Sequence, residues 1–345
     1  MDKESKVNEQ KETGKDFLIR RPRRNRSTAA IRGLICETHL LPSQLVAPLF
    51  VIEGKNQQTS ISSMPFIFRQ TIDLLLKEVA SLTQLGIEAI NLFCAVSPTL
   101  KNAKASEAVR QGNLMQRAVQ EIRAAFPNIC IMVDIALDPY TDHGHDGLVN
   151  EKGEVDNDAT LPLLAQMAQL AGEAGADVVA PSDMMDGRVG YIRQELDRAG
   201  LSHVLILSYA AKYASAFYGP FRETLHSTPK FGDKKGYQLN PANSREALLE
   251  CQLDEKEGAD LLLIKPAITC LDIICKAKAM TSLPIGAYQV SGEYSMIMAA
   301  GQNGWLNAEE TLVESLVAIK RAGADFILTY GAKTYAKKWR QFHQL

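Results

Sequence analysis

The sequence predicts an α/β fold, a (β/α)8 TIM barrel preceded by an extended arm. Three observations predict it: short apolar runs recur along the chain, segments with apolar residues at helical spacing separate these runs, and glycines end several of the segments. With 345 residues, 46% of them hydrophobic, the chain can bury a large core. We expect a short disordered tail over residues 1–16, an N-terminal arm over 17–40 and a barrel domain over 41–345.

Eight apolar runs give the expected strands. Each is nearly continuous in apolar character, which is typical of strands buried on both faces of a parallel sheet. In chain order they span residues 45–51, 87–93, 129–135, 176–182, 203–208, 259–266, 284–290 and 324–330. Three of them begin alike, within "AGADVVAPS", "EGADLLLIKP" and "RAGADFILTY", which indicates a weak internal repeat.

Helices are expected between these strands. The segments 158–175 and 308–323 carry apolar residues at helical spacing. Four expected helices end at a glycine directly before the next strand, the usual C′ position: Gly86, Gly175, Gly258 and Gly323. An open doubly wound sheet is the alternative, but it would bind a nucleotide at a glycine-rich first turn, and the sequence has neither a GxGxxG motif nor a P-loop. We therefore favour the barrel.

The overall composition argues against several classes of protein. The formal net charge of −2 does not favour a polyanionic partner, and no apolar run approaches the roughly 18 residues needed to span a bilayer. The N-terminus lacks the apolar segment of a signal peptide, and its acidic residues argue against a transit peptide. Six cysteines occur without a CxxC pair, several of them within apolar runs, so we expect reduced thiols and a cytoplasmic protein.

The barrel prediction localises function, because barrel enzymes build their active sites at the carboxyl ends of the strands. The residues to consider are therefore those that directly follow each apolar run: the segment from Asp134 to Asp146, then Ser182, Asp183, Lys212, Lys265, Ser291 and Tyr330. The segment "DIALDPYTDHGHDG", residues 134–147, holds four aspartates and two histidines. Taken alone, it is either a metal site or a polar loop at a strand end.

Two lysines at neighbouring strand ends are candidate nucleophiles. Lys265 ends a strand that is otherwise wholly apolar, and Lys212 lies a few residues beyond the preceding strand. Either lysine alone is readily explained as snorkelling to solvent. Adjacent strands lie about 4.8 Å apart, so the two ammonium groups could share one cavity and lower each other's pKa. A neutral amine is what attack on a carbonyl requires.

A long insert, residues 218–244, follows Lys212. It contains three prolines, three glycines and many charges, and an insert of this kind in a compact domain is usually a lid or is disordered. Arg222, Lys234 and Lys235 suit closure over an acidic substrate, whereas a solvated loop is the alternative interpretation.

Six long motifs together resemble one family. They are "APSDMMDGRV" (180–189), "SYAAKYASAFYGPFR" (208–222), "FGDKKGYQLNPANSREAL" (231–248), "LLLIKPA" (261–267), "YQVSGEYSMI" (288–297) and "RAGADFILTYGAK" (321–333). The chain closely resembles the porphobilinogen synthases, also called 5-aminolevulinate dehydratases, from residue 17 to its end. The resemblance implies that two molecules of 5-aminolevulinate condense to porphobilinogen with loss of two waters, an early step of tetrapyrrole synthesis.

The resemblance also implies a role for each strand-end residue. Lys265 would form a Schiff base with the first substrate and Lys212 with the second, while Asp138, Asp146, Ser182 and Asp183 would steer the free amino group and move protons. Substrate binding would fall to Ser291 and Tyr330 for the first carboxylate, and to Arg222 and Lys234 for the second, with Phe221 and Gln238 beside them. Two of these have simpler explanations: Tyr330 as a core residue and Ser291 as a helix N-cap.

The family includes a zinc-dependent type with three cysteines in the segment after the third strand. The cognate positions here are Ala136, Asp138 and Asp146, so no thiolate remains for a sulfur-rich zinc site. Carboxylates suit magnesium or sodium, or no metal. We expect the aspartate-rich, zinc-independent type, although His143 and His145 in the "HGHDG" turn could still bind something.

A second metal position in the family maps onto Glu250. Many zinc-independent members bind an activating magnesium there, on the helix after the lid; a solvated acidic helix face is the alternative. We expect that helix to begin at Asn243 as N-cap, with Glu246 three residues on. The resemblance further implies a homo-octamer in which the basic stretch 20–33 embraces a neighbour. A nucleic-acid arm is the other interpretation of this stretch, and the lack of stacking aromatics argues against it.

Two rival functions remain. A class I aldolase also uses a barrel lysine but needs only one, so Lys212 and the cationic lid argue against it. A barrel kept as a binding or assembly protein would most plausibly have lost a lysine or the "VSGEY" motif, and the sequence retains both.

Overall fold

The computed structural model describes residues 20–343, so the expected tail over 1–16 and the first residues of the expected arm lie outside the described residues. The chain divides into two units between His39 and Leu40. In the first unit, a 3-10 helix (Pro22–Arg26) precedes α1 (Ala29–Leu34), and the Thr28 hydroxyl caps α1 by accepting a hydrogen bond from the Ile31 N–H. Neither helix contains a buried residue, so the described part of this unit, residues 20–39, has no core of its own.

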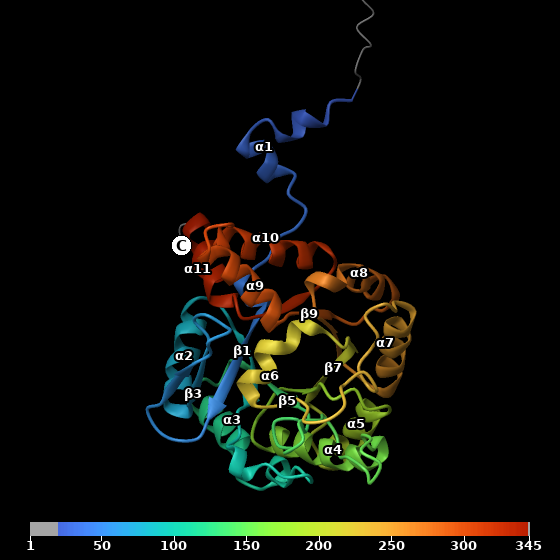
Figure 1. Cartoon of the computed structure of the whole chain (residues 1–345). Coiled ribbons are helices and arrows are strands. Elements are labelled where there is room, and N and C mark those ends of the chain that lie inside the picture. Colours follow the sequence, from blue (N-terminus) through green and yellow to red (C-terminus); the bar gives the residue numbers. More distant parts are fainter. Residues whose placement is uncertain (1–19, 344–345) are drawn as a thin grey trace, which may run out of the picture. The chain divides into compact units, whose positions relative to one another are not determined.

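The second unit is a closed barrel of eight parallel strands, as predicted (Figure 1). Each strand pairs with the next in chain order, and pairing of the last strand with the first, Leu45 opposite Ile327, closes the ring. The barrel strands are β1 (Leu45–Ile52), β4 (Ala89–Cys94), β5 (Cys130–Ile135), β6 (Val178–Pro181), β7 (Leu205–Lys212), β8 (Leu261–Lys265), β9 (Ile285–Gln289) and β10 (Phe326–Thr329).

Two short strands lie outside the predicted set. β2 (Gln58–Ser60) pairs antiparallel with β3 (Phe68–Thr71), and β3 continues the sheet beside the end of β1. All three residues of β2 are polar and exposed, so no apolar run marks them in the sequence. The pair extends the barrel wall at the carboxyl end of β1.

Helices surround the ring of strands, and none among the described residues is long and apolar enough to cross a membrane (Figure 1). Gly86, Gly175, Gly258 and Gly323 have φ angles of 80°, 103°, 103° and 119°, which confirms them as left-handed helix ends. The remaining α-helices are α2 (Ile72–Gln84), α3 (Leu114–Ala125), α4 (Asn157–Glu173), α5 (Arg188–Arg198), α6 (Gly219–Leu225), α7 (Arg245–Glu257), α8 (Leu271–Met280), α9 (Ser291–Gln302), α10 (Ala308–Arg321) and α11 (Ala332–His343).

The internal repeat has a structural cause at the amino ends of the strands. In each copy, the aspartate of the "GAD" sequence accepts a hydrogen bond from the backbone N–H of the first or second residue of the preceding strand. Asp177 accepts from Ile131 at 2.7 Å, Asp260 from Ile206 at 2.8 Å and Asp325 from Ile285 at 2.7 Å. The repeat therefore joins consecutive strands at their amino ends. The candidate site residues lie at the opposite, carboxyl ends.

Two local predictions are wrong. The strand expected to end at Ser208 continues to Lys212, because a shift of register between Ser208 and Ala211 allows β7 to keep pairing with β8. The N-cap of α7 is Ser244, not Asn243. Asn243 instead donates a side-chain hydrogen bond to the Glu246 carboxylate at 3.1 Å, so its amide acts beside the helix start without capping the backbone.

Candidate active site

The two predicted lysines are direct neighbours across the sheet. Lys212 ends β7, Lys265 ends β8, and the two residues are register partners. Because paired residues of adjacent parallel strands point to the same side, both side chains enter the mouth of the barrel. They are only 6% and 5% exposed. The two buried amines thus lie at adjoining strand ends, where the sequence placed the lysine pair.

Aromatic rings surround the amine of Lys265. Its Nζ lies 4.8–5.1 Å from the ring centroids of Tyr209, Tyr218, Phe221 and Tyr288. Rings of this kind stabilise a cation less well than water and a carboxylate together do. Burial, reinforced by the charge of Lys212, lowers the pKa of Lys265 to about 7. A substantial fraction of the amine is therefore neutral and nucleophilic near neutral pH.

Lys212 has a polar environment instead. Its Nζ donates to Asp146 Oδ2 at 3.4 Å and to the backbone carbonyl of Ser182. The snorkelling alternative does not hold for either lysine, since both amines are buried. The two amines are therefore chemically distinct: one lies among rings and the other is bonded to oxygen.

Asp146 bonds to several polar side chains of the site. It is fully buried, and its Oδ1 lies 2.6 Å from the Nζ of Lys234, which also approaches Asp138 at 3.4 Å. The amide of Gln238 donates to Asp146 Oδ2 at 3.4 Å. Burial alone would raise the pKa of Asp146, but Lys212 and Lys234 hold it well below its usual value. Asp146 thus remains a carboxylate that fixes two cations.

Asp134 belongs to the site but is absent from the predicted set of catalytic residues. It is buried within β5, and burial together with the Asp138 charge raises its pKa to about 7. Among the described residues its Oδ1 has no hydrogen-bond partner. A lone carboxyl group inside the apolar run "ICIMVDI" is the signal that could have identified it. A carboxyl group that titrates near neutral pH can both accept and return a proton.

The structure separates Ser182 from Asp183. The Ser182 carbonyl accepts from Lys212, whereas Asp183 turns toward Arg188, with 3.9 Å between Asp183 Oδ2 and Arg188 Nε. The Met185 N–H donates to Asp183 Oδ1 at 2.7 Å, and Arg188 also pairs with Asp254 at 3.2 Å. Burial raises the pKa of Asp183 to about 6, against the opposing effect of Arg188. Asp183 therefore lies beside the site, in a buried network of its own.

A narrow crevice, too small to hold a water molecule, adjoins Lys265. Phe221, Ser291 and Tyr330 line it together with Tyr218, Tyr288 and Val290. The Tyr330 and Tyr288 hydroxyls lie 3.0 Å apart. Ser291 is not the N-cap of α9, which is Val290; its Oγ instead accepts from the Phe221 N–H at 3.1 Å. Two hydroxyl groups thus lie beside the neutral amine, as carboxylate recognition would require.

The insert is more ordered than the predicted structureless loop. It holds α6, which carries Phe221 and Arg222. Its far end bonds to the end of β7, since the Leu239 N–H donates to the Lys212 carbonyl at 3.0 Å. Lys234 is only 5% exposed, so the solvated-loop interpretation fails there. Lys235 is exposed and pairs with Asp233 at 3.5 Å, so the structure does not bring it to the site. We call residues 218–244 the lid.

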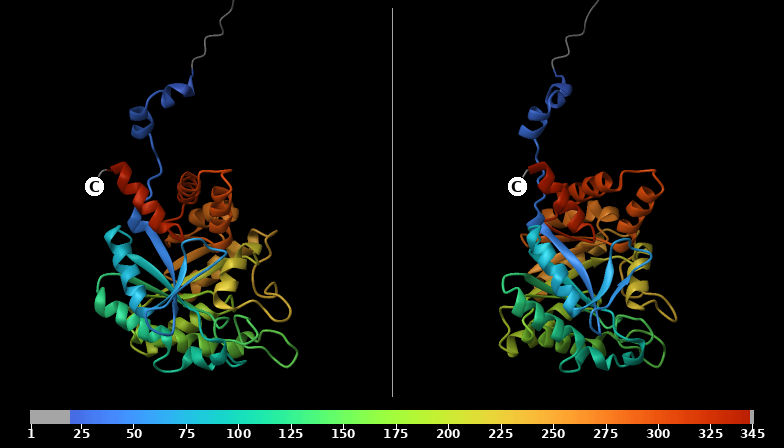
Figure 2. Two further views of the ribbon diagram at one scale, coloured as in Figure 1. Left: turned by 60° about the vertical axis from the view of Figure 1, so that its left-hand side comes forward. Right: turned by 90° about the vertical axis from the view of Figure 1, so that its left-hand side faces the viewer.

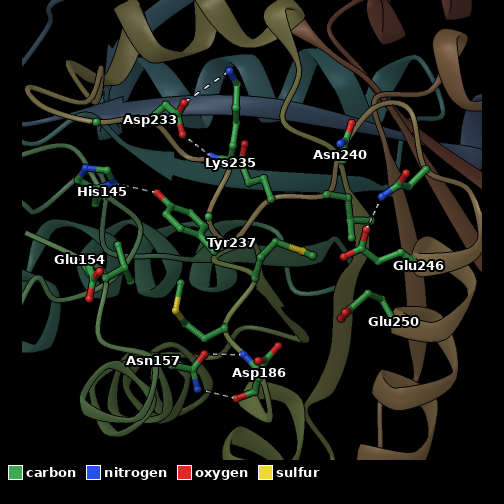
Figure 3. A pocket seen from close by; sticks show the side chains of 18 of the residues that line it. His145, Glu154, Asn157, Asp186, Asp233, Lys235, Tyr237, Asn240, Glu246 and Glu250 are labelled. Atoms are coloured by element: carbon green, nitrogen blue, oxygen red, sulfur yellow. Dashed lines mark hydrogen bonds and ion pairs between the residues drawn. The ribbon is translucent and has the colours of Figure 1, made fainter.

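A larger pocket lies beside the lid, and the lid residues Lys235, Tyr237 and Asn240 line it (Figure 3). Glu250 lines it together with Glu246, Asp186 and Glu154, and the loops around residues 150 and 235 project side by side at this end of the barrel (Figure 2). Burial raises the pKa of Glu250 to about 7 although Arg188 opposes this shift. Within residues 20–343 no three His, Cys, Asp or Glu side chains converge as metal ligands. Glu250 is half-buried, and a single carboxylate of this kind would hold a cation largely through the cation's water shell.

Comparison with known proteins agrees with this geometry. The family model "Delta-aminolevulinic acid dehydratase" matches residues 19–338. The chain is 54% identical over 315 residues to delta-aminolevulinic acid dehydratase of Chlamydia pneumoniae, covering 91% of this chain and 95% of the relative. It is 48% identical to that of Halalkalibacterium halodurans, covering 94% and 98%. The Toxoplasma gondii enzyme, solved with its product porphobilinogen, superposes with a TM-score of 0.91 at 45% identity, covering 92% of this chain and 91% of that one. The chain belongs to the delta-aminolevulinic acid dehydratase family.

Proposed function

We propose that the protein is a porphobilinogen synthase, a hydro-lyase that condenses two 5-aminolevulinate molecules through lysine Schiff bases. The observation that carries the proposal is the pairing of Lys212 with Lys265, two buried amines of unequal chemistry at adjoining strand ends. A class I aldolase needs one such lysine, and a binding protein needs none. A pair held at one barrel mouth suits a reaction that joins two carbonyl compounds.

In the proposed reaction, the neutral amine of Lys265 adds to the ketone of the first substrate, and loss of water leaves an imine. Lys212 forms the second imine in the same way. A protonated imine draws electron density from the neighbouring carbon, which allows a carbon–carbon bond to form. As the ring closes, both lysines return as amines, so the net loss is two waters. Asp134 and Asp138 are the groups placed to move protons.

The substrate carboxylates would bind at opposite sides of the lysine pair. Ser291 and Tyr330, in the crevice beside Lys265, suit the first substrate. Arg222 and Lys234 on the lid suit the second, with Gln238 adjacent. In the structure Lys234 is paired with Asp146 and Asp138, so binding of a second carboxylate would require it to exchange partners.

We further propose that turnover requires no zinc. Ala136 offers no ligand, while Asp138 and Asp146 are engaged by lysines. Carboxylates without thiolates suit hard cations better than zinc. Glu250, outside the catalytic pocket, would bind an activating, allosteric magnesium, with waters completing its coordination shell.

Assembly and location complete the proposal. The described part of the first unit has no core of its own, which suits an arm that packs against a neighbouring subunit of a homo-octamer. The six cysteines are free thiols, which suits a reducing cytoplasm. Sedimentation of the full chain and of a chain lacking residues 1–39 tests the arm: the shortened chain is expected to form smaller assemblies.

One experiment tests the activity. The purified protein is incubated with 5-aminolevulinate and assayed for a pyrrole product, and a parallel sample is reduced with borohydride. We expect pyrrole from the wild type, substrate linked to Lys265, and loss of both in Lys265→Met. Absence of pyrrole from the wild type would refute the function, whereas label found only on other lysines would refute the assignment of Lys265.

A further inference from the structure

The "HGHDG" turn, residues 143–147, is packed against the lid. Gly144 has a φ of 80°, and a Cβ at this position would lie 2.6 Å from the carbonyl oxygen of Thr228. The Lys230 N–H donates to the His143 carbonyl at 3.0 Å. The backbones of turn and lid therefore approach so closely that a side chain at residue 144 would force them apart.

Both ring nitrogens of His145 bond to the lid, and Figure 3 shows the bond to Tyr237. Nε2 lies 3.0 Å from the Phe231 carbonyl oxygen and Nδ1 lies 3.2 Å from the Tyr237 hydroxyl. The imidazole also packs on the Phe231 ring, with 5.0 Å between centroids. The residue is 4% exposed. His145 thus contacts the lid at two positions on either side of Lys234.

One protonation state satisfies every partner in this arrangement. The Phe231 carbonyl can only accept, so Nε2 must carry a hydrogen. The Tyr237 oxygen already accepts from the Asp146 N–H at 3.3 Å, so its own hydrogen is free to be donated to Nδ1. The neutral Nε2–H tautomer of His145 completes the network, and it leaves neither ring nitrogen for a metal ion.

We propose that His145 is a positioning residue that latches the lid at Phe231 and Tyr237, and so fixes Lys234 and Gln238 at Asp146. Lys234 lies between the two latched residues, and Gln238 directly follows the second. The latch acts on the second-substrate side of the site, because Arg222 and Lys234 both lie on the lid. It does not touch Lys265. This inference rests on the proposed function for its kinetic consequence, but the contact itself can be tested without turnover.

Two half-replacements separate the bonds. His145→Asn keeps an acceptor near Nδ1 and loses the donor to Phe231, whereas His145→Gln keeps a donor near Nε2 and loses the acceptor for Tyr237. Tyr237→Phe removes the Nδ1 bond from the lid side, together with the acceptor of the Asp146 N–H, and it serves if a change at His145 prevents folding. His203→Asn, at an exposed histidine far along the chain, is the matched control.

The first readout is trypsin cleavage of the lid without substrate, since Lys230 and Lys235 are exposed on it. We expect cleavage to quicken roughly fivefold for each hydrogen bond lost, the effect of about 1 kcal/mol. The second readout is steady-state kinetics with borohydride trapping. The KM for 5-aminolevulinate should rise by a similar factor, and kcat should fall by less. Trapping at Lys265 should keep its wild-type rate.

His145→Gln and Tyr237→Phe combined should cost little more than Tyr237→Phe alone, because the bond between His145 and Tyr237 is already lost in Tyr237→Phe. Full additivity would overturn the latch, as would lid cleavage at the wild-type rate in folded variants. Loss of trapping at Lys265 in a folded variant would also overturn it, by placing His145 in the first-substrate pocket. A wild type that makes no pyrrole would refute the proposed function and leave the cleavage test intact.

Discussion

At the scale of single residues, the two lysines differ because of what lies around each amine. Lys265 is held among four rings, and Lys212 is bonded to a carboxylate and a carbonyl. The ammonium charge of Lys212 also disfavours that of Lys265. In the proposed reaction Lys265 would therefore attack first, since its pKa lies near 7 and only a neutral amine attacks.

The first prediction concerns this mutual effect. Burial and the Lys212 charge together bring the pKa of Lys265 to about 7, so Lys212→Met should move that pKa upward. Only the neutral amine attacks, so the rate of imine trapping at Lys265 should rise with pH up to the pKa and then level off. In Lys212→Met the midpoint should lie at higher pH, which slows trapping below neutrality. Lys235→Met, at an exposed site, should leave the pH midpoint of trapping unchanged. A midpoint that moves to lower pH in Lys212→Met would contradict the argument.

The second prediction separates the two substrate sites. Lys234→Ala removes a charge-assisted contact of about 1.5–3 kcal/mol, so the apparent affinity for the second substrate should fall roughly ten- to hundredfold. Imine formation at Lys265 should be preserved, because Lys234 bonds to Asp146 and Asp138 rather than to Lys265. Steady-state kinetics and single-turnover trapping measure the two steps. Lys235→Ala, one residue along the lid and exposed, is the control. Failure of the first imine in Lys234→Ala would show that the roles are assigned wrongly.

At the scale of elements, the strands depend on anchors at their amino ends. Asp260, at the start of β8, accepts from the first N–H of the buried part of β7, at Ile206. The third prediction is that Asp260→Ala lowers the free energy of unfolding by about 1–3 kcal/mol, because it leaves that N–H without a partner. Asp260→Asn retains a carbonyl acceptor and should lose much less. Urea unfolding of both variants checks this, and equal losses would mean that the carboxylate charge, not the hydrogen bond, matters.

The elements that the sequence predicted are those with a repeating apolar signal. All eight barrel strands have one, and the four helix-ending glycines have the left-handed φ that only glycine adopts cheaply. β2 has three polar residues, and the register shift that extends β7 to Lys212 depends on pairing with β8 rather than on local sequence. Such features arise from tertiary contacts, so a window of sequence does not contain them.

The site residues also divide into those that the sequence could place and those that depend on tertiary contacts. Lys212, Lys265, Asp138 and Asp146 could be placed because barrel topology brings all strand ends to one mouth. The partners of Asp183 and Lys235 could not be predicted, since they depend on whether a side chain turns inward or outward at a loop. The contact of His145 with the lid joins segments far apart in sequence, through the path of a long insert.

At the scale of the whole molecule, the proposed magnesium site at Glu250 would link the pocket lined by Glu250 to activity. The fourth prediction is that zinc-selective chelation leaves activity intact while added magnesium raises it. Glu250→Ala should lose the magnesium response but keep basal turnover, because both lysines are untouched. A ligand that binds one state of the protein better than another stabilises the state that it binds. Magnesium at Glu250 would in this way favour the assembly in which the lid is ordered. Activity assays across a magnesium series, with metal analysis of the active protein, test this; stoichiometric zinc whose removal abolishes activity would overturn it.

Closure of the barrel by β1 and β10 has a consequence for how the molecule is made. Leu45 and Val46 pair with Ile327 and Leu328, and the Tyr335 hydroxyl donates to the Leu40 carbonyl at 2.8 Å. One edge of β1, the first barrel strand synthesised, therefore stays unpaired until β10, the last, has been made. Ring closure between segments so distant in sequence is entropically costly and slow. During translation β1 is an exposed parallel edge, and the nascent chain is most prone to aggregate in the interval before β10 leaves the ribosome.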